Sequence, residues 1–432
     1  MYKKLIWISV AIMPFIASAQ LGGNLMNRAK AKVAQRANNK TDREMDRTLD
    51  AIEGKETTQP TSNTKTTQGT TANDEETTET KTSSVKSFSK FDFVPGEKII
   101  YTEDFAQEAI GELPVTWNSS GKGEVMTLSS QAGKWLRIFE NNTYLTGNKK
   151  KFGENYTIEF DLMFYFEPKV KGYVLPGWQV GLFASGDKDA ADNNFLKQQD
   201  ELTNTEVHFG YGSYALAYVE SRHKRAQTFS SDKMELGDVL SSFNKVVHYS
   251  MQVQRTRFRL WIDDKKVFDI PRAINVSDSM NQVYFHLEGS NYQEEEIGLF
   301  LSNIKIATGL PDTRHKLVDE GKFSTTGILF DVAAATIKPE SSGVLKEVAE
   351  AIKSSAGMRV KIIGHTDSDG ADATNLELSK KRAEAVKAAL VKDWNIDAAL
   401  FETDGKGEAQ PAGDNKTKEG KAQNRRVEFI KL

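Results

Sequence analysis

The chain has 432 residues, which is long enough for two or three domains. Its net charge is −3 and 27% of its residues are charged, a balance that argues against a general nucleic-acid binder. The sequence contains no cysteine, so we expect domains that are stable through their cores alone, without disulfides. For the same reason we expect no lipid anchor on an N-terminal cysteine.

The first nineteen residues, 1–19, have the pattern of a targeting segment. A basic start at Lys3-Lys4 is followed by an apolar run from Leu5 to Ile16 and by the small residues Ala17-Ser18-Ala19. This order is typical of a secretory signal peptide. The apolar run is short for a bilayer span. We therefore expect cleavage after Ala19 and an exported protein that is soluble or peripheral.

Two polar segments follow. Residues 20–54 hold two narrow apolar stripes at helical spacing, one that starts at Leu25 and one that starts at Met45. They predict a marginal helix, which is either simply solvated or docks onto a partner or anionic lipid. Residues 55–87 are rich in threonine and almost free of large apolar side chains, so they predict a disordered tether.

Residues 88–308 change to short alternating segments that are separated by glycines and by Asp263-Asp264. Many short strands without a helix between them predict an all-β sandwich. The expected strands are Trp135–Phe139, Tyr156–Phe166, Trp178–Phe183, Val207–Val219, Val246–Val253, Phe258–Ile262 and Val283–Leu287. The stretch from Tyr249 to Phe268 resembles the paired strands that close a concanavalin-like lectin or glucanase fold. The resemblance implies a jelly-roll sandwich.

Three features of this segment bear on its chemistry. Glu159 and Asp161 match two carboxylates of a glycosidase strand pattern, but the third position holds Met163 or Phe164, so we expect no hydrolysis. The run Asp187–Asn194 offers oxygen ligands for calcium but departs from the EF-hand pattern, which favours a solvated loop. Four aromatic residues could either stack on sugars or fill the core: Trp117, Tyr173, Trp178 and Tyr211.

Residues 309–324 read as a short connector, so we expect the domains on either side to be held closely. Residues 325–432 alternate strand and helix, which predicts a compact α/β domain. The expected strands are Ile328–Phe330, Val360–Ile363 and Arg426–Leu432, and the expected helices run from Pro339 to Gly357 and from Leu376 to Trp394. The side chains expected to face the core are Val344, Leu345, Val348, Ala349 and Ile352 in the first helix, and Leu378, Ala383, Val386 and Leu390 in the second.

The most informative motif lies in this last domain. Gly-His-Thr-Asp, from Gly364 to Asp367, follows a predicted strand, and Arg382 stands fifteen positions later on a predicted helix. An aspartate and an arginine that face each other can hold a ligand that carries both an ammonium and a carboxylate. The plainer alternative is that Asp367 caps a turn and forms an ion pair with Arg382. His365 has no nucleophile spaced around it, so we expect a structural role for it.

The motif resembles the OmpA-like peptidoglycan-associating family. The resemblance covers about the last quarter of the chain and rests on Gly364–Gly370, Asn375, Leu378-Ser379, Arg382-Ala383, Gly405–Glu408 and Asn424–Val427. It implies that Asp367 and Arg382 bind the amino-acid end of diaminopimelate in the peptidoglycan peptide. The residues that it implies around this pair are Thr366, Asn375, the backbone of Leu378, and Arg425. Of Arg425 and Arg426, one should line the pocket edge, and the other should point to solvent or to an acid on a neighbouring helix.

These patterns predict an exported, non-enzymatic envelope protein without catalytic residues, cofactor or metal. The resemblance to the OmpA-like family implies the periplasm or the outer membrane of a Gram-negative cell. Its C-terminal domain would hold peptidoglycan, and its sandwich would present a surface to a glycan or an envelope protein. Two alternatives stay open. One is a lectin-like protein whose main site lies in the sandwich, and the other is a structural spacer recruited by residues 20–54.

Overall fold

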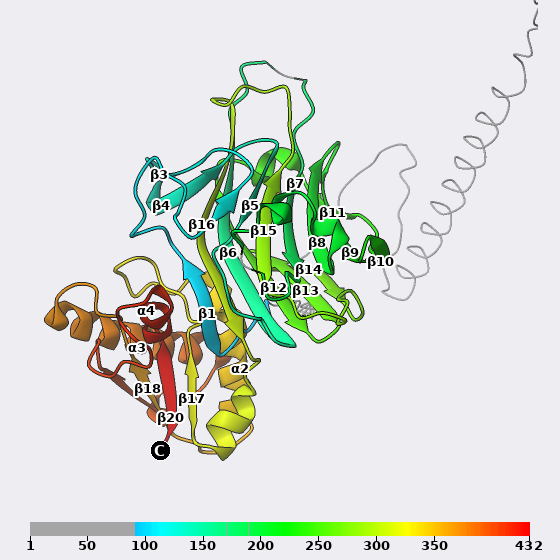
Figure 1. The fold of residues 1–432 in the computed structure, drawn as a ribbon. Coiled ribbons are helices and arrows are strands. Elements are labelled where there is room, and N and C mark those ends of the chain that lie inside the picture. The colour runs from blue at the N-terminus through cyan, green and yellow to red at the C-terminus, as the bar shows by residue number, and fades with distance from the viewer. Residues whose placement is uncertain (1–90, 171, 189) are drawn as a thin grey trace, which may run out of the picture. The chain divides into compact units, whose positions relative to one another are not determined.

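The computed structural model describes residues 91–432 except residues 171 and 189. The predicted signal peptide, marginal helix and tether lie outside the described residues. The described part begins with two large antiparallel sheets, which are followed by a smaller α/β domain (Figure 1).

The first sheet has eight strands and is built around its two longest ones, β6 and β16. The strand order is β14-β13-β12-β6-β16-β4-β3, and β1 also pairs with β16. The bounds are β1 Lys98–Glu103, β3 Gly123–Leu128, β4 Gln131–Ile138, β6 Asn155–Phe166, β12 Val246–Gln254, β13 Arg257–Ile262, β14 Lys265–Ile270 and β16 Ile297–Thr308.

The second sheet also has eight strands. Its order is β10-β9-β8-β7-β15-β5-β2, and β11 also pairs with β9. The bounds are β2 Asn118–Ser119, β5 Asn142–Leu145, β7 Trp178–Phe183, β8 Asn204–Tyr211, β9 Ala215–His223, β10 Ala226–Ser230, β11 Met234–Gly237 and β15 Gln282–Leu287.

The main hydrophobic core takes side chains from both large sheets, as in a sandwich. In the central strand β6, Ile158, Phe160 and Leu162 belong to this core. Successive side chains of a strand point to opposite faces. Glu159 and Asp161 therefore lie on the other face of the first sheet, although both are buried. That face carries the polar cluster described below.

Most of the predicted strands are confirmed. β7 has the predicted bounds, and β6, β12, β13 and β15 differ from prediction by one residue at one end. The expected hairpin is present, since β13 and β14 pair as antiparallel strands across a turn in which Asp263 has a φ of 50°. The prediction for Val207–Val219 was wrong in treating this stretch as one segment. It contains the end of β8 and the start of β9, which are joined by the bend at residues 212–214.

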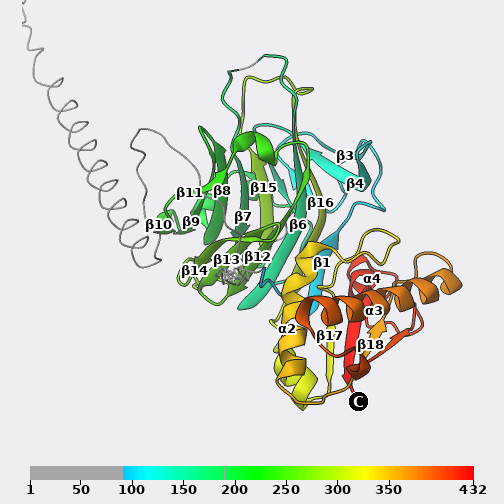
Figure 2. The same ribbon diagram turned by 180° about the vertical axis from the view of Figure 1, so that it is seen from behind.

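The C-terminal domain has a four-stranded sheet in the order β17-β20-β18-β19. Only β18 and β19 run parallel. Helices α2 and α3 lie on one side of this sheet (Figure 2) and share a hydrophobic core with it. The bounds are β17 Lys322–Thr325, α2 Ser342–Lys353, β18 Val360–Gly364, α3 Asp372–Trp394, β19 Phe401–Gly405, α4 Lys418–Asn424 and β20 Val427–Lys431.

The first strand of this sheet lies earlier in the chain than we predicted. Residues Ile328–Phe330 do not form a strand, and Phe330 makes only an isolated bridge to Ile337. Instead β17 occupies part of the expected connector, because Phe323 alternates with the exposed residues Lys322 and Ser324 and buries its ring against β20. The segment 309–324 is thus partly built into the α/β domain.

Helix α2 buries its predicted face, whereas α3 begins earlier than predicted, at Asp372 instead of Leu376, and its buried stripe also differs. Leu378 is only half-buried, and the polar residues Asn375 and Ser379 occupy the buried stripe with Ala383. Burial of Ser379 is possible because its Oγ donates to the carbonyl of Leu376 and accepts from the N–H of Gly407. An apolar pattern could not reveal this, since the buried side chains at this end of α3 are polar.

The sandwich and the α/β domain are in direct contact, mainly between β1 and α4 (Figure 1). Ile99, Ala307 and Ala422 form a small apolar cluster there. The side chain of Gln423 accepts from the N–H of Ile99 and donates to the carbonyl of Glu97. This contact fixes the end of α4, which leads directly into the candidate site.

Candidate functional site

The loop after β18 holds the acidic residue of the motif. Strand β18 ends at Gly364, where α3 lies so close that a Cβ atom would stand 2.1 Å from the carbonyl oxygen of Ser379. Asp367 follows and is buried. Its Oδ1 accepts a hydrogen bond from the backbone N–H of Asp369 (3.1 Å), and its Oδ2 accepts one from Nη1 of Arg425 (2.5 Å). The carboxylate is therefore oriented by its own loop and by one guanidinium.

Asn375 holds this loop in place from α3. Its Nδ2 lies 3.2 Å from the carbonyl oxygens of Asp367 and Asp369, and 2.7 Å from Oε2 of Glu408. These protein acceptors use the N–H groups of its amide. Asn375, predicted as part of the site, is therefore a positioning residue for the loop.

Arg382 lies on α3 and makes no ion pair with a carboxylate among the described residues. Its Nε donates to the carbonyl of Ala334 (3.0 Å), and its guanidinium carbon lies 4.8 Å from the ring centroid of Phe330. Burial and the nearby Arg425 lower the pKa of Arg382, while Asp367 opposes this. The plainer alternative, an ion pair between Asp367 and Arg382, is thus absent here, because Asp367 pairs with Arg425 instead.

The two arginines after α4 have different surroundings. Arg425 reaches Asp367 and its side chain is 42% exposed, so it lines the pocket edge. Arg426 is buried and donates from Nε and Nη2 to Oε1 of Glu428 (2.9 and 2.7 Å). We expected the second arginine to meet solvent or an acid on a neighbouring helix. The acid that Arg426 meets is instead Glu428 on β20, because the side chain of Arg426 turns inward at the start of that strand.

The remaining predicted positions line the same pocket. Thr366 is buried and its Oγ1 has no hydrogen-bond partner within residues 91–432 as described, while the half-buried Leu378 contributes apolar surface. His365 is also buried, and burial together with the neighbouring Arg426 guanidinium lowers its pKa to about 4. It is therefore neutral at pH 7, in keeping with the expected structural role.

These residues open into a cavity of about 660 Å³. One side carries the motif residues Thr366, Asp367, Leu378, Arg382 and Arg425. The other side is formed by residues of the first large sheet, namely Glu159, Asp161, His248, Asn303 and Lys305. The pocket that the motif predicted is thus one part of a larger cleft between the sandwich and the α/β domain.

The sandwich wall of the cleft is a network of charges. His248 Nδ1 lies 2.6 Å from Oδ1 of Asp161, and the amide of Asn303 donates to Oδ2 of Asp161 (2.7 Å). Lys305 Nζ lies 2.8 Å from Oε1 of Glu159. Both acids were noticed in the sequence, but His248, Asn303 and Lys305 were missed because they lie on distant strands. The sequence offered one signal for this cluster: His248 lies in the predicted strand Val246–Val253 at a position that faces away from the sandwich core.

This network sets the protonation of its members. Burial by itself lowers the pKa of His248. The hydrogen bond to Asp161 and the nearby Glu159 outweigh this effect and raise that pKa to about 10. Burial alone would raise the pKa of Glu159, but Lys305 and His248 lower it. The pKa of Asp161 is likewise lowered, by His248 and Asn303 against the effect of burial. At pH 7 the wall holds two carboxylates, one imidazolium and one ammonium.

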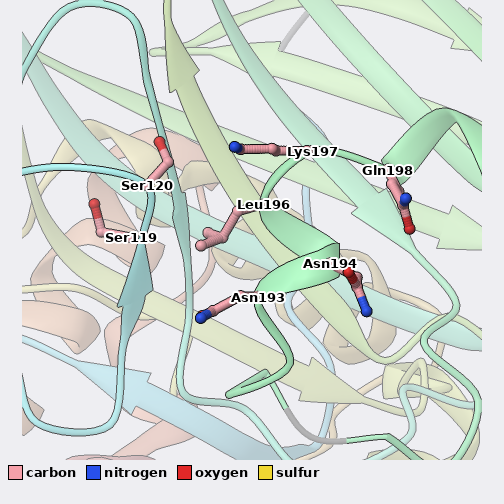
Figure 3. A pocket seen from close by; sticks show the side chains of 7 residues that line it. All are labelled: Ser119, Ser120, Asn193, Asn194, Leu196, Lys197 and Gln198. Atoms are coloured by element: carbon pink, nitrogen blue, oxygen red, sulfur yellow. The ribbon is translucent and has the colours of Figure 1, made fainter.

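A second pocket, of about 410 Å³, lies on the sandwich (Figure 3). Ser119 and Ser120 form one side, and the 3₁₀ turn Asn193–Leu196 and the residues after it form the other. Asn193, Leu196 and Lys197 extend toward the two serines. The amide of Asn193 already accepts a hydrogen bond from Asn118. The pocket therefore offers hydroxyl, amide and ammonium groups around one leucine.

The other sandwich features are mostly structural. Of the four aromatics, Trp117 and Trp178 are buried, Tyr211 accepts a hydrogen bond from the indole of Trp178, and only Tyr173 is exposed, at 44%. In the acidic loop, Asp187 pairs with Lys151 and Asp192 pairs with Lys188. Among the described residues there is no group of three or more histidine, aspartate and glutamate side chains arranged to hold a metal ion.

Fold and site together define a modular protein, in which a β-sandwich and a small α/β domain share a cleft lined by charges of both signs. Within the part of the chain that the structure covers, no helix is long and apolar enough to cross a membrane.

Comparison with known proteins identifies the α/β domain. The model of the OmpA family matches residues 329–425. Outer membrane protein A of Bordetella avium is 43% identical over 100 residues, which are 23% of this chain and 51% of that protein. The outer-membrane lipoprotein YfiB of Pseudomonas aeruginosa is 34% identical over 146 residues, 33% of this chain and 84% of that protein. The chain belongs to the OmpA family.

A solved structure is also similar to part of this chain. The peptidoglycan-associated lipoprotein of Burkholderia pseudomallei is 29% identical and has a TM-score of 0.23, over 25% of this chain and 89% of that one. The chain spans only about half the length of the Bordetella relative.

Proposed function

We propose that the protein binds peptidoglycan non-covalently and that Asp367 and Arg382 receive the amino-acid end of diaminopimelate. The observation that carries this proposal is that the guanidinium of Arg382 is held in place without a carboxylate partner among the described residues. Its guanidinium is partly buried and held by Phe330 and the carbonyl of Ala334, yet it has no carboxylate partner among the described residues. A ligand carboxylate would supply that partner, through the two-pronged hydrogen bonding that a guanidinium favours.

Asp367 suits the other charge of such a ligand. Its carboxylate is oriented, with Oδ2 facing the partly exposed Arg425. The ammonium of an amino acid would share or replace this contact, and Arg425 would then be free to turn toward solvent. A single centre that carries an ammonium and a carboxylate therefore matches the Asp367 and Arg382 pair better than a simple anion or cation does.

Membership of the OmpA family supports peptidoglycan association in the cell envelope. The protein then acts in the periplasm or at the outer membrane, attached to the cell wall by its C-terminal domain. The sandwich is the part that this attachment would place beside the wall. No step of this role requires catalysis by either domain.

Binding to purified sacculi tests the proposal. The full-length mature protein should co-sediment with them, and Arg382→Ala should lose most of this binding. Arg359→Ala is the matched control, because Arg359 lies in the same domain but pairs with Glu402 at an exposed position outside the cleft. Equal sedimentation of wild type and folded Arg382→Ala would reject this site.

A second candidate function is carbohydrate binding by the sandwich. It is favoured by the pocket in Figure 3, where serine, asparagine and lysine side chains are grouped as sugar hydroxyls require. A glycan array probed with the mature protein and with Lys197→Ala tests this function. Signals that are absent, or that do not depend on Lys197, would remove this candidate.

A further inference from the structure

The cleft has more recognition groups than one amino-acid centre can use. The Asp367 and Arg382 pair occupies only one side of a cavity of about 660 Å³. Cavities of this size hold ligands considerably larger than a single amino acid. The opposite side belongs to the sandwich, and this arrangement is held by direct contact between β1 and α4.

Several hydrogen-bonding groups in this cleft have no partner among the residues that the structure describes. His248 is buried, and its Nε2 makes no hydrogen bond within the described residues; Oε2 of Glu159 lies 3.8 Å away, within ion-pair distance but too far for a hydrogen bond. The Oγ1 of the buried Thr366 is likewise unbonded. Leaving such groups unpaired costs free energy that a bound oxygen atom would recover.

The hydrogen-bond donors near His248 suit an anionic ligand group. His248 and Lys305 are balanced by Asp161 and Glu159, so the network itself carries little net charge. Lys338 lines the same cleft near Asp161, and it has no ion pair among the residues that the structure describes. The imidazolium N–H, which makes no hydrogen bond, and this ammonium supply donors for an anionic group, while Asp331 and Glu340 also line the cleft.

We propose that His248 and Lys338 form a second subsite of the cleft, which binds another carboxylate of the peptidoglycan stem peptide. This inference rests on the proposed function, and it adds that the sandwich takes part in recognising the same ligand. A stem peptide carries carboxylates besides the diaminopimelate centre that Asp367 and Arg382 would hold. The protein would therefore bind the peptide more tightly than it binds the free amino acid.

Calorimetric titration of the full-length mature protein with two ligands tests this inference. The ligands are free diaminopimelate and the soluble tripeptide alanyl-glutamyl-diaminopimelate. Wild type should bind the tripeptide about 10-fold or more tightly than the amino acid, since hydrogen bonds to charged groups are being added. Lys338→Met and His248→Gln should remove most of this difference and leave the affinity for free diaminopimelate unchanged.

His248→Gln leaves two buried carboxylates near one lysine and could unfold the sandwich, so a second sandwich variant is needed. Asn303→Gly alters the same wall without backbone strain, because Asn303 has a φ of 52°, which glycine adopts readily. Asn303→Gly should also weaken binding of the tripeptide and leave binding of free diaminopimelate unchanged. Asn141→Gly is the control for Asn303→Gly, because Asn141 has a φ of 60° and lies outside the cleft. Lys346→Met on α2 is the control for Lys338→Met, because Lys346 also lies outside the cleft. Neither control should change the affinity for either ligand.

The outcomes separate the two proposals. If neither ligand binds, the proposed function itself fails and this inference fails with it. If both ligands bind wild type equally, or if Lys338→Met and Asn303→Gly leave the preference for the tripeptide intact, the second subsite is rejected while the diaminopimelate site stands.

Discussion

At the scale of single residues, the arrangement of the charges matters more than their presence. Asp367 and Arg382 are close enough to interact electrostatically, but each is held by other groups, Asp367 by Arg425 and Arg382 by Phe330 and Ala334. A direct ion pair would have to be broken before a ligand could bind. Holding the two charges apart leaves Arg382 ready for a ligand carboxylate, whereas Asp367 would share its carboxylate between Arg425 and the ligand.

The first prediction concerns the joint action of this pair. Asp367→Ala or Arg382→Ala should each weaken peptidoglycan binding by about 10-fold to 150-fold, since a hydrogen bond to a charged group contributes roughly 1.5–3 kcal/mol. The double variant should lose less than the sum of the two, because each group orients the ligand for the other. Arg382→Lys should recover little. Sacculus co-sedimentation, with circular dichroism to verify folding, measures these effects; strict additivity would contradict joint action.

The second prediction concerns His365. Its folded-state pKa of about 4 lies below the ordinary value of 6.5, so the unfolded chain takes up a proton first as the pH falls. The stability linked to neutral His365 is therefore complete above pH 6.5 and is lost progressively down to pH 4. His365→Asn should flatten the dependence of the unfolding free energy on pH in this window.

Urea denaturation at several pH values measures that dependence. His315→Asn is a suitable control, because Asp319 raises the pKa of the exposed His315 and its contribution has the opposite sign. A wild-type slope that survives in His365→Asn would show that the neighbouring Glu428, whose pKa is lowered, dominates instead.

At the scale of elements, the position of β17 could not be predicted from the pattern of apolar residues. The stretch Ile328–Phe330 is the more apolar one and was predicted as the strand, yet Lys322–Thr325 pairs with β20. A four-residue alternation with one large apolar residue is a weak signal by itself. Its pairing is decided by the partner strand, whose residues Val427 and Phe429 are buried in the domain core.

The third prediction follows from this strand. A fragment of residues 310–432 should be more stable than one of residues 325–432, because the shorter fragment lacks β17 and the buried side chains of Leu317 and Phe323. Loss of buried large apolar side chains costs about 2–5 kcal/mol each. Thermal unfolding followed by circular dichroism compares them. Equal midpoints would mean that β17 belongs to the connector after all.

At the scale of the whole molecule, the contact between domains decides whether the cleft exists as one site. Lys418 on α4 lies 2.8 Å from Glu103 and 2.6 Å from Glu108 of the sandwich segment. Glu103 is 2% exposed, and burial raises its pKa in spite of Lys418. A nearly buried carboxylate at this interface thus depends on one lysine from the other domain.

The fourth prediction tests this dependence. Lys418→Met should destabilise the contact by about 1–3 kcal/mol, because Glu103 is left without a charge partner. Scanning calorimetry should then show the two domains unfolding more independently than in wild type. Glu103→Gln in the Lys418→Met background should restore part of the loss, whereas Lys416→Met, at an exposed position, should have no effect. An unchanged thermogram for Lys418→Met would argue against the contact.

The sequence by itself determined that a β-sandwich precedes an α/β domain, most strands of the sandwich, the helices of the C-terminal domain and the motif that contains Asp367 and Arg382, whose role in binding stays a prediction. These follow from local periodicity and from a motif whose residues lie close together in the chain. Only the tertiary structure decided that Asp367 pairs with Arg425, that α3 buries Asn375 and Ser379, and that His248 and Lys305 face the same cleft. The physical reason is that these contacts join residues far apart in sequence, and a buried polar side chain is specified by its partner rather than by its own neighbours in the chain.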